Sequence, residues 1–232
     1  FVGATSFFDF GAFFTDQIGV TVGDPLGGYF EIYRTTDGGN TWGTRIPTGS
    51  IAPIIAGEYA FTNSFEVHGN TCWFLTNKSR TYRSNDAGLT WQVFNNENPA
   101  TDNTPGGQTC FKNELEGLMY NAEAMWSTTD GGETWFEYVP EGTVRSGEIT
   151  FVPGSTNTYV SIGNQWGNTN TQTQRGTSIS NDGGLFWESI NDLGDTVNVN
   201  GGGAVQFFND SVGFAAGFST TSTSGGIFKY VG

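Results

Sequence analysis

Thr35-Thr36-Asp37-Gly38-Gly39-Asn40-Thr41-Trp42 is the first of four similar stretches in the chain. The others are Ser84–Trp91, Thr128–Trp135 and Ser180–Trp187, and each keeps Thr or Ser, Asp, Gly and Trp at the same offsets. Their aspartates are 49, 44 and 52 residues apart. A self-match at a period of about 40–50 residues is typical of β-propeller blades. We therefore predict an all-β propeller of four-stranded antiparallel units.

The residue types in these four stretches, called here the first to fourth repeated turns, predict capped hairpins. An aspartate accepts hydrogen bonds from backbone N–H groups a few residues on, and a glycine allows the positive φ that closes a turn. A tryptophan then supplies a large apolar body to pack between neighbouring sheets. We expect structural roles for Asp37, Asp86, Asp130 and Asp182, and for Trp42, Trp91, Trp135 and Trp187.

Alignment on the repeated turns predicts three short strands before each turn and one after it. The strand that opens each unit is expected at 6–8, 64–67, 109–111 and 149–152. A fifth unit without a turn follows, with strands at 204–208, 212–217 and 226–230. The approximate units are 1–49, 50–98, 99–141, 142–193 and 194–232, in one domain. Either Phe1–Thr5 completes the fifth unit, or further units precede the first.

Composition excludes several classes of partner. The chain of 232 residues has 35 Gly, 15% aromatic residues and a formal net charge of −14. A chain with this excess of acidic over basic side chains is a poor partner for nucleic acid and for anionic membrane surfaces. Because no run of 18 apolar residues occurs, we expect no membrane insertion. The chain opens in the middle of a strand pattern without a signal peptide, so we expect a processed protein or part of a longer one.

Cys72 and Cys110 are the two cysteines of the chain. They are expected on strands of the second and third units, where they either form a disulfide between neighbouring units or are two small buried hydrophobic residues. Their spacing does not match a metal site, and no calcium-loop pattern occurs. We therefore expect no metal and no cofactor.

The repeated turns resemble the Asp-box, or BNR, repeat of sialidases, sortilin-type receptors, xyloglucan-cleaving propellers and Ycf48-like photosystem assembly factors. The stretches Gly23-Asp24-Pro25, Gly57-Glu58-Tyr59 and Gly225–Tyr230 are also similar to secreted propellers of Bacteroidota. That resemblance implies secretion or surface display through type IX secretion, and about seven blades. The role in photosystem assembly is associated with a basic patch, which this acidic chain does not favour.

Catalytic patterns in the sequence are weak. A sialidase needs three converging arginines and a Tyr–Glu pair, for which Arg80 and the adjacent Glu58-Tyr59 are the nearest candidates. Neighbouring strand residues point to opposite faces, so that pair would need a loop. A glycoside hydrolase of another type needs two carboxylates beside a cleft, for which Asp24, Glu58 and Glu123 are candidates. A polysaccharide hydrolase is the alternative function.

Binding is the preferred function, because loops on a rigid scaffold carry recognition. Trp166 lies among amide residues, where it either stacks on a sugar ring or packs under its own loop. Tyr59, Glu58, Asp24 and Arg80 are further candidate ligand-binding residues. The apolar connector at residues 51–61 could instead be buried between chains of an assembly. Asp195-Thr196-Val197 and Asp210-Ser211-Val212 match an O-glycosylation pattern or ordinary turns, which makes Thr196 and Ser211 candidate glycan sites.

We therefore predict a non-catalytic secreted or cell-surface module. Its partner would be a glycan or an extracellular protein, or it would be a structural part of a larger assembly.

Overall fold

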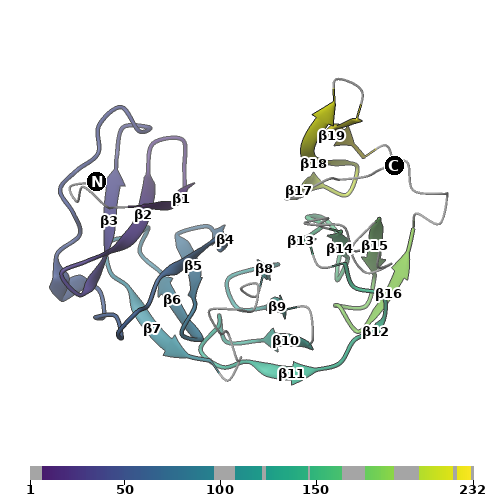
Figure 1. Cartoon of the computed structure of the whole chain (residues 1–232), viewed down its shortest axis with the longest axis horizontal. Coiled ribbons are helices and arrows are strands. Elements are labelled where there is room, and N and C mark those ends of the chain that lie inside the picture. The colour runs from purple at the N-terminus through teal and green to yellow at the C-terminus, as the bar shows by residue number, and fades with distance from the viewer. Residues whose placement is uncertain are drawn as a thin grey trace. The chain divides into compact units, whose positions relative to one another are not determined.

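The structure is a computed structural model that describes residues 7–96, 108–121, 124–145, 147–163, 176–190, 204–221 and 224–230. It is all-β, a five-bladed propeller of small antiparallel sheets, which confirms the predicted fold class (Figure 1). The chain forms two compact units. Unit 1 comprises Phe1–Met119 and Ser127–Phe136, and unit 2 comprises Tyr120–Trp126 and Glu137–Gly232.

Unit 1 contains the first two sheets and parts of the third. The first sheet is β1 (Phe8–Phe13), β2 (Gly19–Leu26) and β3 (Tyr29–Thr35). The 3-10 helix η1 (Thr48–Ser50) follows, and the second sheet is β4 (Ala60–His68), β5 (Thr71–Thr76), β6 (Arg80–Ser84) and β7 (Gln92–Asn95). The third sheet, at which the two units divide, is β8 (Gln108–Phe111), β9 (Gly117–Asn121), β10 (Ala124–Thr128) and β11 (Phe136–Tyr138).

Unit 2 contains the last two sheets. The fourth sheet is β13 (Glu148–Phe151), β14 (Tyr159–Ile162), β15 (Thr177–Ser180) and β16 (Phe186–Ser189), with β12 (Glu141–Gly142) added in parallel beside β16. The fifth sheet is β17 (Ala204–Asn209), β18 (Val212–Thr221) and β19 (Ser224–Lys229). Among the described residues, no helix is long and apolar enough to cross a membrane.

Two details of the first sheet differ from the prediction. The opening strand is Phe8–Phe13 and not residues 6–8, because Phe10 and Ala12 provide the buried side chains. The segment after the first repeated turn is not a regular strand. It still follows β3 through the backbone bonds from Gly43 N–H to Arg34 O (2.9 Å) and from Ile46 N–H to Ile32 O (2.8 Å).

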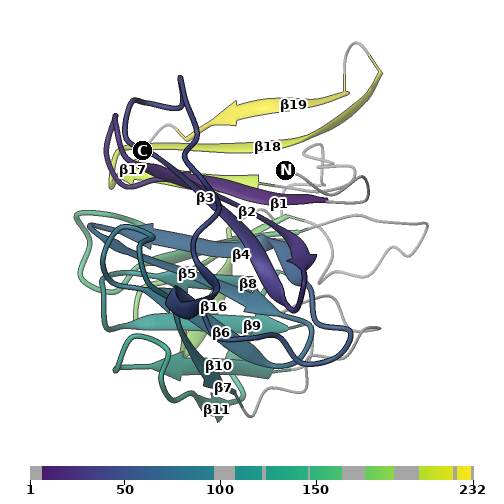
Figure 2. The ribbon, with the colours of Figure 1, turned by 90° about the vertical axis from the view of Figure 1, so that its left-hand side faces the viewer.

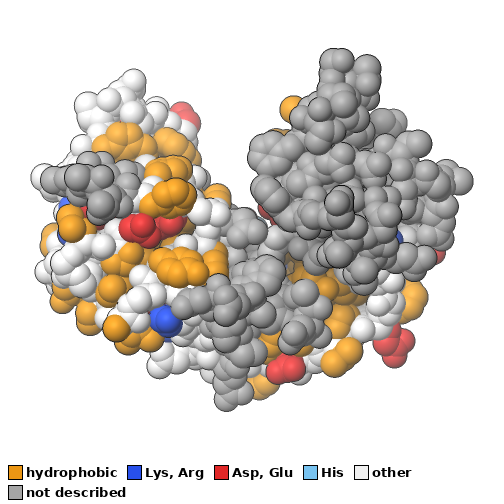
Figure 3. Space-filling view, viewed as in Figure 1, with side chains coloured by type: hydrophobic (Ala, Val, Ile, Leu, Met, Phe, Trp, Pro, Cys, Tyr) orange, Lys and Arg blue, Asp and Glu red, His pale blue; other side chains and the backbone are white. Residues whose placement is uncertain are grey.

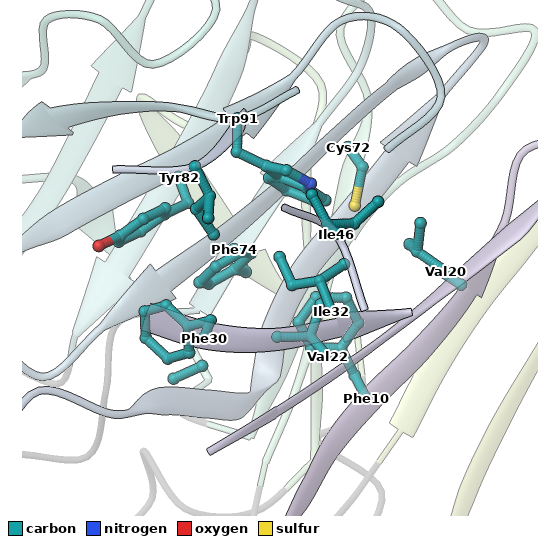
Figure 4. Close-up of a cluster of buried hydrophobic side chains, with 13 residues drawn as sticks. Phe10, Val20, Val22, Phe30, Ile32, Ile46, Cys72, Phe74, Tyr82 and Trp91 are labelled. Atoms are coloured by element: carbon teal, nitrogen blue, oxygen red, sulfur yellow. The ribbon is translucent and has the colours of Figure 1, made fainter. Parts of the chain in front are cut away.

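The core of unit 1 lies between the first and second sheets. Its largest members form an aromatic cluster in which Phe74 contacts Phe10, Phe30 and Tyr82, and Trp91 closes one side (Figure 4). Aliphatic side chains from β2 and β3 fill the remaining space. This burial stabilises the pair of sheets, since removal of apolar surface from water contributes about 25 cal/mol per Å².

The second and third sheets meet through an aromatic stack. The indole of Trp73 lies on the ring of Phe111, with centroids 4.0 Å apart and planes at 9°. Its Nε1–H donates to the Gly131 carbonyl at 2.8 Å, in the third repeated turn. The stack therefore ties a strand of one sheet to the turn of the next.

The predicted disulfide alternative is wrong, because Cys72 and Cys110 are both free and buried. Cys72 precedes Trp73 and Cys110 precedes Phe111, and the two aromatic rings face one another. Successive strand residues point to opposite faces, so the two thiols point away from each other. Cys72 instead packs in the core of unit 1, as a small buried hydrophobic residue.

Three sheets share a contact between a phenylalanine of the opening strand and a glycine six residues later. The pairs are Phe13 with Gly19, Phe111 with Gly117, and Phe207 with Gly213. In each pair a Cβ on the glycine would come within 2.6–2.8 Å of the ring. The ring therefore lies directly on the neighbouring strand, and only glycine leaves room for it.

Candidate functional site

The repeated turns have nearly the same hydrogen bonds. In the second turn, Asp86 Oδ1 accepts from the Ser84 hydroxyl (2.8 Å) and the Thr90 N–H (2.9 Å), and Oδ2 accepts from the Thr90 hydroxyl (2.6 Å). The Gly88 N–H donates to Ser84 Oγ at 2.9 Å, with Gly88 at φ 84°. Asp37 and Asp130 bind their Thr partners in the same way. Both oxygens of these carboxylates are thus engaged within the turn.

Hydrogen bonding lowers the pKa of all four turn aspartates. Donation by Thr41 and Thr35 lowers the pKa of Asp37. Burial acts to raise the pKa of Asp86 and Asp130, but donation by their threonines outweighs it. The backbone N–H of Phe186 is the main cause that lowers the pKa of Asp182. These groups are anionic caps of turns, a structural role.

Three of the four turn tryptophans are buried: Trp91, Trp135 and Trp187. Trp42 is 38% exposed, and its ring lies edge-on to Phe13. The second and third turns each lie against a preceding sheet. The second turn lies against the first sheet, where Gly88 approaches Val20, and the third lies against β6, where Gly132 approaches Thr81.

A second face of unit 1 lies at the opposite ends of the strands from the repeated turns. β2 runs into the tight turn at Gly27-Gly28 and β3 runs back, so the first repeated turn and the β2–β3 turn are at opposite ends of the sheet (Figure 2). The connector at residues 53–59 joins this end through the bond from Ile54 N–H to Gly28 O, at 3.0 Å. We call this the Tyr59 face and define it by Leu26, Ile55, Tyr59, Asp9 and Asp24.

A buried ion pair holds the connector of the Tyr59 face. Glu58 Oε2 accepts from Arg80 Nη1 at 2.7 Å and from the Ile55 N–H at 3.0 Å, and Oε1 accepts from the Thr76 hydroxyl at 2.7 Å. Arg80 also donates to the Pro53 carbonyl. Breaking such a buried pair typically costs about 3–5 kcal/mol, because the remaining charge has no partner. Glu58 and Arg80 therefore shape the connector from within and do not present their charges to a ligand.

The same network leaves apolar side chains in solvent. Tyr59 is fixed through its N–H, which donates to Asn77 Oδ1 at 2.9 Å, and its ring meets Phe61 edge-on. Leu26, Ile55 and Tyr59 are 41%, 50% and 37% exposed. Ile51 and Ile54 instead pack on the core, so only part of the apolar connector is available to a partner. Figure 3 shows hydrophobic side chains around acidic ones on this part of unit 1.

Asp9 and Asp24 lie at two neighbouring β-bulges. The register of β1 and β2 shifts between Phe8 and Phe10, and that of β2 and β3 shifts between Gly23 and Pro25, so each aspartate is the extra residue of its strand. Bulges commonly re-aim side chains beside functional sites. Asp9 is buried, and its Oδ2 has no hydrogen-bond partner.

Burial, and then the nearby charge of Asp24, raises the pKa of Asp9 to about 7. The carboxyl is therefore able to hold or release a proton near neutral pH. The sequence pattern indicated Asp24 as a candidate residue, but not Asp9. The available signal was a carboxylate inside the otherwise apolar run Phe7-Phe8-Asp9-Phe10, since an acidic side chain is rarely placed in such a strand without a reason.

Of the remaining predicted residues, the structure describes Ser211. Trp166, Thr196 and Glu123 lie outside the described residues. Ser211 is exposed in the β17–β18 turn, where its hydroxyl donates to Asp210 Oδ1 at 2.8 Å. In the described part of the chain, no three His, Cys, Asp or Glu side chains are placed to hold a metal ion.

No protein family model matches the chain, and no curated protein matches its sequence. By structure it is similar to YCF48 bound to a D1 peptide, with a TM-score of 0.55, 18% identity and coverage of 96% of this chain and 66% of that one. YCF48 from Cyanidioschyzon merolae gives a TM-score of 0.50 at 17% identity, with coverage of 97% and 71%. The GH74 enzyme of Niastella koreensis gives 0.53 at 18% identity, with coverage of 92% and 28%.

The chain thus spans just under two thirds of the peptide-bound YCF48 chain and about a quarter of the GH74 enzyme. All three are propellers, and at these identities the likeness establishes the fold alone.

Proposed function

We propose that this chain is a non-catalytic binding module of a secreted or cell-surface protein, and that its Tyr59 face binds a segment of a partner protein. The observation that carries the proposal is the Glu58–Arg80 ion pair, which fixes a connector whose Ile55 and Tyr59 remain in solvent. A pre-ordered loop with exposed apolar groups binds without paying the entropy of ordering, as recognition loops do. The aliphatic character of Leu26 and Ile55 favours a protein segment over a sugar ring.

The partner segment should offer an apolar side chain beside a basic one. Asp9 and Asp24 lie at the same end of the first sheet as Leu26 and supply negative charge next to the apolar groups. The net charge of −14 also speeds the approach of cationic partners. The peptide ligand of the similar YCF48 structure shows that a propeller of this kind can take a peptide.

Selection from a random peptide display library tests this function. We expect enriched peptides that carry Lys or Arg beside an apolar residue. Their affinity should fall about tenfold or more in Ile55→Asp and Tyr59→Ala, as at other interface anchors. Val139→Asp, at an 80% exposed position in unit 2, is the matched control and should bind normally. Peptides that bind the Tyr59-face variants as well as the parent chain would refute the assignment.

A glycan array with the same variants tests the sugar alternative. The ligand would be a carbohydrate and not a protein if two results were obtained. The parent chain would bind a glycan that Tyr59→Ala does not bind, and the peptide selection would give no enrichment. Secretion, type IX sorting and membership of the Asp-box repeat proteins belong to the same proposal, on the resemblance of the sequence. Fractionation of the source cells, with the protein found in the cytoplasm, would contradict the location.

A second candidate function is a glycoside hydrolase, which the Asp9–Asp24 pair favours. With a pKa of about 7, Asp9 could donate a proton to a glycosidic oxygen while Asp24 activates a water molecule. Reducing-end release from polysaccharides should then be lost in both Asp9→Asn and Asp24→Asn and kept in the exposed-site variant Asp16→Asn. Absence of any release by the parent chain removes this candidate.

A further inference from the structure

Three of the four repeated turns contain an aspartate followed by a glycine, at Asp37-Gly38, Asp130-Gly131 and Asp182-Gly183. In such a pair the glycine nitrogen can attack the side-chain carboxyl carbon of the aspartate, because glycine has no Cβ to hinder the approach. The nitrogen–carbon bond forms as a carbon–oxygen bond breaks, and the N–H proton leaves with the hydroxyl group as water. The product is a succinimide ring in the main chain.

Water then opens the succinimide ring at either of its carbonyl carbons. Attack at the side-chain carbon restores aspartate. Attack at the main-chain carbon gives isoaspartate, in which the chain continues through the former side chain. The three pairs consist of the same two residues, so the surroundings of each pair decide how fast it reacts in the folded chain.

The carboxylate of the fourth turn accepts fewer hydrogen bonds than those of the other two. Asp37 Oδ2 accepts the Thr41 hydroxyl at 2.6 Å, and the third turn has the same bond at 2.5 Å. Phe186 replaces this threonine in the fourth turn, so position 186 has no hydroxyl to donate to Asp182 Oδ2. The neutral carboxylic acid loses water more readily than the carboxylate does. Donors to both oxygens stabilise the carboxylate and therefore slow the reaction.

The fourth turn is also the most open of the three. Asp182 is exposed, whereas the aspartates of the first and third turns are half-buried. A Cβ at Gly183 would meet no described atom within 4 Å. At Gly38 it would lie 3.0 Å from a backbone oxygen of the β1–β2 turn, and at Gly131 it would lie 2.7 Å from Arg83 Nη1. Ring closure requires this part of the backbone to rotate, and the fourth turn has the most space for it.

One restraint is common to the three pairs. The glycine N–H donates to a carbonyl in the turn between the first two strands of the same sheet. This bond is 3.0 Å from Gly183 to Asn157, 2.9 Å in the first repeated turn and 2.8 Å in the third. It has to open in every case before the nitrogen can attack. The carboxyl group and the space around the glycine therefore distinguish the pairs, and this bond does not.

We propose that Asp182-Gly183 is a modification site, at which the folded chain isomerises spontaneously to isoaspartate. The same pair of residues is protected in the first and third turns by the threonine hydroxyl and by the packing around the glycine. Isomerisation adds a methylene group to the main chain and moves the carboxylate away from its present donors. These are the N–H groups of Leu185 and Phe186 and the Ser180 hydroxyl, at 3.1, 3.0 and 2.8 Å. The turn that precedes β16 then loses its cap.

Ageing of the purified 232-residue chain at neutral pH and physiological temperature tests the proposal. Peptides of the aged chain are identified by electron-transfer fragmentation, which distinguishes isoaspartate from aspartate. Isoaspartate at position 182 should accumulate about tenfold or more faster than at positions 37 and 130, since a hydrogen bond to a charged group is worth about that factor. Equal rates at the three positions, or no isoaspartate at position 182, would overturn the proposal.

Two variants test the stated causes separately. Gly183→Ala should suppress the reaction, because the added Cβ hinders the attacking nitrogen. The fold accepts this residue, since the second turn carries Ala87 at the same position with φ 56°. Phe186→Thr supplies the missing hydroxyl and should slow the reaction at Asp182 about tenfold, with parent rates at positions 37 and 130. An unchanged rate in Phe186→Thr would refute the role of the missing bond.

The same measurement on the chain unfolded in urea shows whether the fold causes the selectivity. Unfolding removes both the threonine bonds and the packing around the glycines, so the three pairs should then react at similar rates. A preference for position 182 that persists in urea would assign the effect to the neighbouring sequence and overturn the proposal.

Discussion

At the scale of single residues, the fourth repeated turn differs from the others by one side chain. It carries Phe186 where the first three carry Thr41, Thr90 and Thr134. Asp182 Oδ1 still accepts the N–H groups of Leu185 and Phe186, at 3.1 and 3.0 Å. The hydroxyl that binds Oδ2 in the other turns is absent from this one.

Phe186→Thr should therefore stabilise the protein. The new hydroxyl would donate to Asp182, a charge-assisted bond worth about 1–2 kcal/mol, and the phenylalanine it replaces is already 50% exposed. Chemical denaturation measures the change, and NMR titration should show a lower pKa for Asp182. The reciprocal variant Thr90→Phe should destabilise by a similar amount. A destabilising Phe186→Thr would mean that the exposed ring contributes more than the missing bond.

At the scale of elements, glycines in the turns set how closely a turn approaches the preceding sheet. Gly88 has φ 84°, and a Cβ there would lie 2.2 Å from Val20 Cγ1. The side chain of Val20 is fully buried between β2 and the second turn. A side chain at position 88 would therefore overlap Val20 unless the turn or the strand shifted.

Gly88→Ala should lower the free energy of unfolding by about 2 kcal/mol or more, since it adds overpacking to an unfavourable φ. Gly49→Ala is the matched control, because Gly49 has open space around its Cβ position and no positive φ. Thermal or urea unfolding of the two variants checks the difference. Equal midpoints would show that the turn moves away from the sheet without cost.

The strands were the most predictable elements, because repeated turns and alternating apolar residues mark them in the sequence. β8 (Gln108–Phe111) and β13 (Glu148–Phe151) lie within about a residue of the strands expected at 109–111 and 149–152. β12 was not predicted, since a parallel bridge of Glu141 and Gly142 beside Trp187 depends on a residue far along the chain.

The candidate site was less predictable than the fold. The sequence indicated Glu58, Arg80 and Tyr59 individually, but not that the first two bind each other across 22 residues. That pairing changes the predicted role of Glu58 and Arg80 from ligand binding to support of the connector, because a paired buried charge is not available to a ligand. Ligand recognition then depends on the exposed residues beside them. Asp9 could not be predicted as a site residue without the positions of two bulges. These bulges arise from strand register and have no local signature in the sequence.

At the scale of the whole molecule, two groups of carboxylates have opposite effects on stability. Burial raises the pKa of Glu148 to about 7. Burial, and then the nearby charge of Asp24, raises the pKa of Asp9 to about 7 as well. The folded chain therefore holds more protons than the unfolded chain between about pH 4 and 7, and stability falls as pH rises through that window. The turn aspartates have lowered pKa values, so their contribution is present above about pH 4 and is lost as pH falls below it.

We expect the chain to be most stable near pH 5 and less stable at pH 8. The double variant Asp9→Asn with Glu148→Gln should flatten the decline between pH 5 and 8, because neither replacement titrates. Urea unfolding at several pH values measures both slopes. Asp16→Asn, at an exposed position, should follow the parent curve. A double variant with the parent slope would assign the decline to other groups.

Phe207 lies on Gly213 as Phe111 lies on Gly117, so the ring-on-glycine contact identifies a sheet independently of the acidic turn. A search for a phenylalanine and a glycine six residues apart therefore detects the fifth sheet from its first two strands alone. Diverged relatives are then better sought with this spacing and the acidic turn together, because each can identify a sheet in which the other pattern is missing.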